Sequence, residues 1–178
     1  TVWQDGPVTR AVRQGAILYL DEIAEAREDV VVVLHSLSDH RRELFIDRTN
    51  EVLTAPSSFQ LVVSFNPGYQ SSLKEMKPST RQRFVSIPFH FPTEDIESEL
   101  LVHESECDQS TARKLVKLAA RVRTLKDLGL KETVSTRLLV NAAKLTVAGI
   151  APRQACEMAM AHTMTDQDEA LTALRDLI

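Results

Sequence analysis

The sequence has few of the residues that mark disulfide-stabilised, metal-binding or membrane proteins. Its 178 residues include two cysteines, which lie far apart at Cys107 and Cys156, and five histidines without ligand pairing. This pattern argues against a disulfide framework or a zinc site and favours free, buried thiols in a reducing compartment. The sequence also lacks an apolar run of membrane-spanning length and a basic-then-apolar leader, so we expect a cytoplasmic protein without membrane insertion.

The sequence also lacks a large excess of charge of either sign. The formal net charge is −4, with 26% charged and 43% hydrophobic residues, so the composition is that of an ordinary globular protein. This balance argues against nucleic acid as the main partner. The length suits one domain, or one domain with a smaller appendage. Thr1 is not a natural initiator residue, so we expect a fragment.

The segment around which the chain is organised is Gly15 to Glu22. The apolar run Ile17 to Leu20 is typical of a strand buried on both faces of a parallel sheet, and Asp21 and Glu22 follow it directly. Ligands of open α/β sheets bind beyond the carboxyl ends of the strands. Two acids there suit phosphoryl transfer, in which one holds Mg²⁺ and the other orients the attacking water. The alternative is an acidic first turn of a helix.

The flanking segments predict further elements of an α/β unit. We expect an amphipathic helix over 2–13 that stops at Gly15, and a crossover helix over 25–38 in spite of its β-branched run. The alternating residues of 42–53, centred on Asp47 to Asn50, predict a β-hairpin, with a solvated loop as the alternative.

A second strong strand is expected from Phe59 to Phe65, followed by Asn66, which either forms a turn or faces the same ligand edge. A short helix over 71–76 and a break at 77–80 precede Arg81 and Arg83. The residues 85–91 predict a third strand, which Pro88 restricts to an edge.

From Pro92 onward the pattern is helical. Helices are expected over 93–106, 110–125, 135–148, 152–163 and from 166 to the end, with Ser110 and Ser135 as caps of the second and third. The apolar stripe that includes Leu115 and Leu118 predicts a bundle core rather than a cofactor site. The boundary near Pro92 therefore predicts two parts, 1–91 and 92–178.

The order of these motifs resembles a known family. Leu20-Asp21-Glu22, a hairpin, Ser64-Phe65-Asn66-Pro67, then Pro78 to Phe84, and finally Ser135-Thr136-Arg137-Leu138-Leu139 together resemble an AAA+ ATPase of the MoxR group, most closely the CbbQ/NorQ/NirQ proteins. These are accessory ATPases for Rubisco activation and nitric oxide reductase maturation. The resemblance covers essentially the whole chain. It implies an α/β fold: part of a P-loop AAA+ parallel sheet between helices, with a hairpin insertion, followed by an all-helical lid.

The resemblance assigns a role to each motif. The strand with Asp21 and Glu22 becomes the Walker B strand, in which Asp21 holds Mg²⁺, through water, and Glu22 polarises the attacking water. Asn66 becomes sensor 1. Arg83, or with less support Arg81, becomes the arginine finger that reaches the nucleotide of the next subunit, because a guanidinium binds phosphate oxygens in bidentate fashion.

Two further assignments follow from the resemblance. In the lid, Arg137 becomes sensor 2, which couples the position of the helical subdomain to the γ-phosphate, and 41–53 becomes the pre-sensor-1 hairpin. For each arginine named here and above, the alternative is a surface salt bridge.

One family motif is missing. The sequence has only five glycines and no Gly-x-x-x-x-Gly-Lys-Ser/Thr, the loop that binds the β and γ phosphates. The resemblance therefore implies the latter part of an AAA+ module, which binds nucleotide poorly by itself and exposes an apolar sheet edge where further strands belong.

The leading functional hypothesis is an ATP-hydrolysing ring, hexameric by resemblance, that remodels a target enzyme through a von Willebrand A domain adaptor. The alternative is a non-catalytic assembly module that supplies arginine fingers and a partner surface. A nucleic-acid motor is disfavoured by the acidic balance and by the mixed charges of 41–48.

Overall fold

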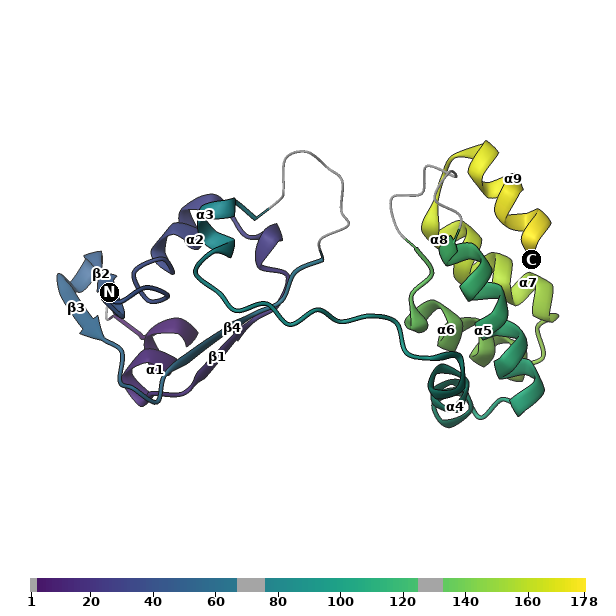
Figure 1. Ribbon diagram of the computed structural model, residues 1–178, viewed down its shortest axis with the longest axis horizontal. Coiled ribbons are helices and arrows are strands. Elements are labelled where there is room, and N and C mark those ends of the chain that lie inside the picture. The colour runs from purple at the N-terminus through teal and green to yellow at the C-terminus, as the bar shows by residue number, and fades with distance from the viewer. Residues whose placement is uncertain (1–2, 67–75, 125–132) are drawn as a thin grey trace. The chain divides into compact units, whose positions relative to one another are not determined.

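The computed structural model describes residues 3–66, 76–124 and 133–178. The chain divides into two compact units, Thr1–Ile87 and Pro88–Ile178, and each is described by itself. The first unit contains short helices and two pairs of strands (Figure 1), namely α1 (Pro7–Gln14), β1 (Ile17–Leu20), η1 (Ile23–Glu25), α2 (Glu28–Val33), β2 (Glu43–Ile46), η2 (Asp47–Thr49), β3 (Glu51–Thr54), β4 (Gln60–Val63) and α3 (Pro78–Arg81).

The helix α1 begins and ends as the sequence predicts. Pro7 occupies its first turn, where the missing N–H costs nothing, and Gly15 closes it with φ 62°. The N–H of Gly15 donates to the Val12 carbonyl at 3.2 Å. One face of α1, with Ala11 and Val12, is buried in the core of the unit. The chain leaves this cap directly into β1.

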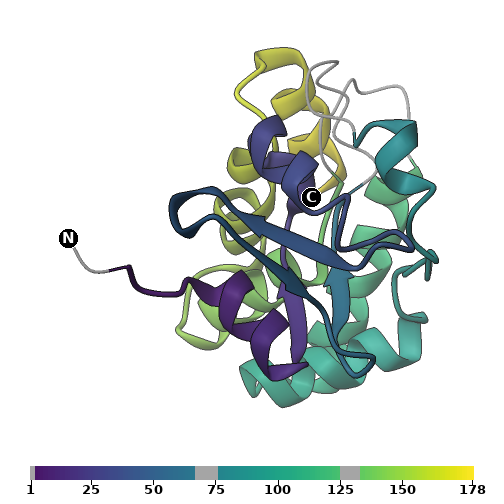
Figure 2. The same cartoon turned by 90° about the vertical axis from the view of Figure 1, so that its left-hand side faces the viewer.

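The strands β1 and β4 form a parallel two-stranded sheet, in which Leu20 pairs with Val63 (Figures 1 and 2). Both strands were predicted, but the expectation that β1 is buried on both faces is wrong. Leu18 is buried, whereas Ile17 is 66% and Tyr19 57% exposed. The reason is that successive side chains of a strand point to opposite faces, and the core of the unit covers only one of them.

The predicted hairpin is confirmed. β2 and β3 pair antiparallel with Ile46 opposite Glu51, and the turn of η2 ends at Asn50, whose φ is 49°. Asn adopts this left-handed conformation more readily than most residues. Leu44 and Ile46 are buried, and Glu51 accepts a hydrogen bond of 2.6 Å from Arg13 at the end of α1. The hairpin is thus attached to the core by both apolar and polar contacts.

Two predicted elements differ from the structure. The helix expected over 25–38 is confined to α2, which contains the four consecutive valines in spite of their low helix propensity and ends at Val33. The strand expected over 85–91 does not form among the described residues, and Val85 and Phe89 are 95% and 92% exposed. Pro88 cannot donate a ladder hydrogen bond, and no described strand pairs with this segment. The helix expected over 71–76 lies outside the described residues, except for Met76.

The second unit is helical, as predicted. Its elements are α4 (Glu94–Ser105), α5 (Gln109–Thr124), α6 (Thr136–Val147), α7 (Pro152–Cys156), the π-helical turn η4 (Glu157–Ala161), α8 (His162–Met164) and α9 (Asp168–Leu177). The side chain of Ser135 caps α6 as expected. At the start of α5, however, Asp108 takes the place expected for Ser110, because its carboxylate accepts the N–H of Thr111 at 3.0 Å.

The core of this unit lies between these helices. Leu101, Ala119, Leu139 and Ala161 are fully buried there, and the predicted stripe residue Leu115 belongs to the same cluster. The stripe of α5 is therefore core, as predicted. None of the helices in the described parts of the chain combines the length and the apolar character that a membrane span needs.

Candidate functional site

Two strand ends meet at one edge of the parallel sheet. Asp21 and Glu22 follow β1, and Ser64 to Asn66 follow β4, which runs in the same direction. The N–H of Ser64 donates to the Leu20 carbonyl at 3.0 Å, and the N–H of Ile23 donates to the Ser64 carbonyl at 3.0 Å. The ladder thus continues past the ends of both strands and fixes the two acids beside Ser64.

A single hydroxyl connects these groups. Ser64 Oγ donates to Oδ1 of Asp21 and accepts the backbone N–H of Glu22 at 3.1 Å. The hydroxyl oxygen of Tyr19 lies 2.9 Å from the same Asp21 oxygen and 3.2 Å from Ser64 Oγ. The hydroxyl groups of Ser64 and Tyr19 thus both contact Oδ1 of Asp21, and neither contacts Oδ2.

These contacts favour the ionised form of Asp21. The Ser64 hydroxyl, and after it the Tyr19 hydroxyl, lower the pKa of the Asp21 carboxyl because both stabilise its charged form. An ionised carboxylate with an oxygen that the two hydroxyls do not engage suits a hard cation such as Mg²⁺. In the described parts of the chain no cluster of three or more His, Cys, Asp or Glu could hold a metal. Mg²⁺ needs no such cage, because it often binds one or two carboxylates together with substrate phosphates and water.

Glu22 adopts an uncommon backbone conformation. Its φ of 50° lies in the left-handed region, which is costly for a residue with a side chain, and it leads into the short turn η1. The hydrogen bond from its N–H to Ser64 helps to hold this conformation. The Glu22 side chain is exposed, and its left-handed backbone ends the extended conformation of β1.

The residues after β4 bring one arginine close to this edge. Asn66 is exposed two residues beyond Ser64, and Phe65 lies between them. The guanidinium of Arg81 stands over the Phe65 ring, 5.7 Å from its centroid, within the range of a cation–π contact. Of the two candidate finger residues, Arg81 is therefore held within its own unit next to the strand end.

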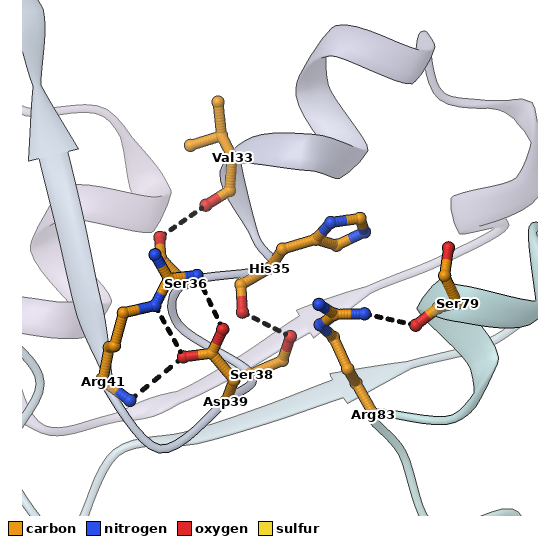
Figure 3. A network of polar contacts seen from close by, with 8 residues as sticks. All are labelled: Val33, His35, Ser36, Ser38, Asp39, Arg41, Ser79 and Arg83. Atoms are coloured by element: carbon orange, nitrogen blue, oxygen red, sulfur yellow. Dashed lines mark hydrogen bonds and ion pairs between the residues drawn. The ribbon is translucent and has the colours of Figure 1, made fainter.

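Arg83 is exposed and follows α3. Its guanidinium donates to the Ser79 carbonyl at the start of the same helix (Figure 3). The intervening Thr80 is buried and lies 3.0 Å from Nε2 of His35. Burial, and then the charge of Arg83, lower the pKa of His35. The contact with His35 anchors α3, and the exposed Arg83 side chain folds back onto the same helix.

The entrance to the hairpin is fixed by two consecutive arginines. Arg41 forms an ion pair of 2.7 Å with Asp39 and lowers the pKa of that carboxyl (Figure 3). Arg42 has φ 53° and donates to the carbonyls of Pro56 and Phe59, each at 2.9 Å. Arg42 thus holds the base of the hairpin against the segment that leads into β4, whereas Arg41 stabilises the local turn through Asp39.

The remaining candidate, Arg137, belongs to the second unit. It is exposed in the first turn of α6, after the cap Ser135. The structure therefore brings Asp21, Glu22 and the segment of Asn66 together at one edge and places Arg81 beside them. Arg137 belongs to the other unit, and its place is given only within that unit.

Sequence reasoning gave no role to Ser64 or Tyr19. Tyr19 was assigned to the apolar run of β1, although its hydroxyl contacts Asp21. Ser64 lies opposite Asp21 only because Leu20 pairs with Val63, and a register shift would move it away. The signal available in the sequence was a hydroxyl residue directly after a strand, which by itself is common.

Comparison with known protein families supports the resemblance. A family model described as "CbbQ/NirQ/NorQ C-terminal" matches residues 97–178, and a model of the AAA domain of the dynein-related subfamily matches residues 1–84. The two matches follow one another along the chain.

Three curated relatives are similar over nearly the whole chain. The denitrification regulatory protein NirQ of Pseudomonas aeruginosa is 52% identical over 100% of this chain and 68% of its own length. Protein CbbQ of Hydrogenophilus thermoluteolus is 54% identical over 98% of the chain and 66% of its own, and protein NorQ of Paracoccus denitrificans is 55% identical over 99% and 66%. The chain thus spans about two thirds of the length of these relatives.

Proposed function

The chain belongs to the CbbQ/NirQ/NorQ family of AAA proteins, and we propose that it forms part of an ATP-hydrolysing ring ATPase that remodels or activates a partner enzyme. The observation that carries the proposal is the ionised Asp21 at the carboxyl edge of two parallel strands, fixed by Ser64 beside Glu22. An acid pair at this edge is suited to a nucleotide and its metal.

Each group at this edge has a chemical task in the proposal. Asp21 holds Mg²⁺ through its water shell, and Glu22 orients and polarises the attacking water. The amide of Asn66, which follows the neighbouring strand, holds that water or the γ-phosphate. A Mg²⁺ ion held there would supply positive charge to offset the negative charge that develops on the phosphates during transfer.

The arginines act on the phosphates from other elements. Arg83 is the preferred finger for the nucleotide of the adjacent subunit, as the family resemblance assigns it, and Arg81, whose guanidinium stands over Phe65 of its own unit, is the second candidate. Both arginines are exposed. Arg137 in α6 binds the γ-phosphate as sensor 2. A hexameric ring, a von Willebrand A domain adaptor and a target such as Rubisco or nitric oxide reductase are part of the same proposal, as is a cytoplasmic location.

The test is ATP turnover by the full-length gene product, which includes whatever precedes Thr1. We expect Glu22→Gln and Arg83→Ala each to abolish most turnover, at least 10²-fold by analogy with other catalytic groups of this class. Glu22→Gln should still bind ATP. Glu99→Gln and Arg113→Ala, which change exposed residues of the second unit, are the matched controls and should retain full turnover.

Mixing the two inactive variants tests the ring. Glu22→Gln subunits still carry Arg83, and Arg83→Ala subunits still carry Glu22, so mixed rings should recover part of the rate. Arg81→Ala mixed with Glu22→Gln serves as the comparison that separates the two arginines. If assembled full-length protein neither binds nor hydrolyses ATP in the presence of candidate partners, the ATPase proposal is wrong and the non-catalytic assembly module replaces it.

A further inference from the structure

The second unit contains a buried ion pair for which the proposed function has no use. Glu97 of α4 is 1% exposed, and Arg123 of α5 donates to its two carboxylate oxygens at 2.8 and 2.7 Å. The Thr136 hydroxyl, at the start of α6, donates to the same carboxylate at 2.6 Å. Three helices therefore meet at one carboxylate.

Arg123 has two further contacts. Its Nε donates to the Val134 carbonyl at 2.8 Å, in the segment that leads into α6. The ring of Phe91, ahead of α4, covers the guanidinium at 3.8 Å from its centroid. We call Phe91, Glu97, Arg123, Val134 and Thr136 the Arg123 cluster. It joins the segment that enters the helical unit to the segment that starts α6.

The electrostatics of the Arg123 cluster favour an ionised pair. Burial raises the pKa of Glu97, but the hydrogen bonds from Arg123 and Thr136 together lower it by more than burial raises it. The pKa of Glu97 therefore lies below its ordinary value. Buried ion pairs of this kind contribute little net stability compared with apolar residues of equal volume. Their bidentate geometry, however, fixes orientation, because both oxygens and the guanidinium plane must remain aligned.

Arg137 is adjacent to this cluster along the chain. It follows Thr136 directly and lies three residues after Val134, and both of these residues are hydrogen-bonded within the cluster. We propose that the Arg123 cluster is a positioning device, which fixes the first turn of α6 and thereby the backbone from which Arg137 extends. This inference depends on the proposed role of Arg137 in binding nucleotide.

The first test replaces Thr136 by valine in the full-length protein. Thr136→Val keeps the shape and removes one hydrogen bond to a carboxylate, so we expect the KM for ATP to rise about threefold to tenfold while the helix content is kept. Thr146→Val is the matched control. The Thr146 hydroxyl bonds the Ala142 carbonyl within the same helix at 2.9 Å, away from the cluster, and its loss should leave KM within about twofold.

A double-mutant cycle connects the effect to Arg137. If Thr136 acts through Arg137, Thr136→Val should have no further effect on KM in an Arg137→Ala background, because the group being positioned is gone. Additive effects would show that the cluster acts by another route and would overturn the inference. A Thr136→Val variant that behaves like Thr146→Val would overturn it as well, even where Arg137→Ala raises KM.

The same cycle separates this inference from the proposed function. If Arg137→Ala leaves KM unchanged, the proposed role of Arg137 is wrong, and a Thr136→Val effect then contradicts the positioning inference too. A second pair of variants adds a conservative comparison. In Arg123→Lys, a single ammonium group cannot form the bidentate pair with Glu97 and also donate to the Val134 carbonyl, so KM should rise. Arg121→Lys changes an exposed position of α5 and should leave KM unchanged.

Discussion

At the scale of the residue, Ser64 has the most consequential contacts of the candidate site. Its hydroxyl donates to Asp21 and accepts the N–H of Glu22, so one side chain holds the Asp21 carboxylate and the Glu22 backbone. Tyr19 supplies a second hydroxyl to the Asp21 carboxylate. These hydrogen bonds favour the ionised form of Asp21, which is the form that binds a cation.

We therefore expect Ser64→Ala to raise the pKa of Asp21 toward its ordinary value, because the largest cause of its lowering is removed. Titration of the carboxyl carbon by NMR measures this shift. Ser57→Ala, an exposed serine in the segment before β4, is the control and should leave the titration unchanged. An unchanged Asp21 titration in Ser64→Ala would contradict this account of the site.

The pKa shift also predicts a pH dependence of stability. A carboxyl whose pKa is lower in the folded state stabilises the fold above its unfolded pKa of about 3.9, and the contribution is lost as pH falls through the folded pKa. Ser64→Ala should therefore destabilise the protein more at pH 7 than at pH 3. Urea unfolding at the two pH values measures this difference.

At the scale of the element, the end of α1 sets the start of β1. Gly15 has φ 62°, and a Cβ at this position would lie 2.2 Å from the Ser58 hydroxyl oxygen. Both the left-handed conformation and the close approach require glycine here. The turn thus delivers β1 into register with β4 only two residues later.

We expect Gly15→Ala to lower the free energy of unfolding by about 1–2 kcal/mol, from the left-handed strain and the displacement of Ser58. Gly6→Ala at the other end of α1 is the matched control. Gly6 is the N-cap of α1 and has φ −74° and open space around its Cα, so that change should cost only the lower N-cap preference of alanine and less than Gly15→Ala. Denaturant unfolding compares the two, and equal effects would show that the geometry of the cap is unimportant.

At the scale of the whole molecule, the buried apolar residues that the structure describes form two clusters, one in each unit. One includes Leu18, Leu37 and Phe59 of the first unit, and the other includes Leu101 and Leu139 of the second. Each unit therefore has a core of its own, which is the physical basis for treating it as a folding unit.

The separate cores predict separate responses to core mutations. Leu139→Ala should destabilise the second unit by about 2–5 kcal/mol through the cavity it leaves, and Phe59→Ala the first unit by about 3–5 kcal/mol. Hydrogen exchange measured by mass spectrometry should show faster exchange in α4 to α6 for Leu139→Ala, and in β1 and β4 for Phe59→Ala. Faster exchange across both units in either variant would contradict independent cores.

Much of the architecture was determined by the sequence. The glycine that ends α1, the hairpin around 47–50, the apolar runs of β1 and β4 and the serine cap of α6 are local signals, and each led to the observed element. The sequence also predicted that Asp21, Glu22 and Asn66 lie at one edge of the sheet, because each follows a strand and parallel strands end at a common edge. The order of these motifs was sufficient to identify the family.

Tertiary structure decided what depends on register and on contacts between distant segments. Ser64 faces Asp21 because of one strand pairing, and Glu97, Arg123 and Thr136 meet because three helices converge. The segment 85–91 has a strand-like pattern but does not form a strand, because no described strand pairs with it. A strand or a buried ion pair requires a second segment of chain, and a local pattern cannot specify where that segment lies.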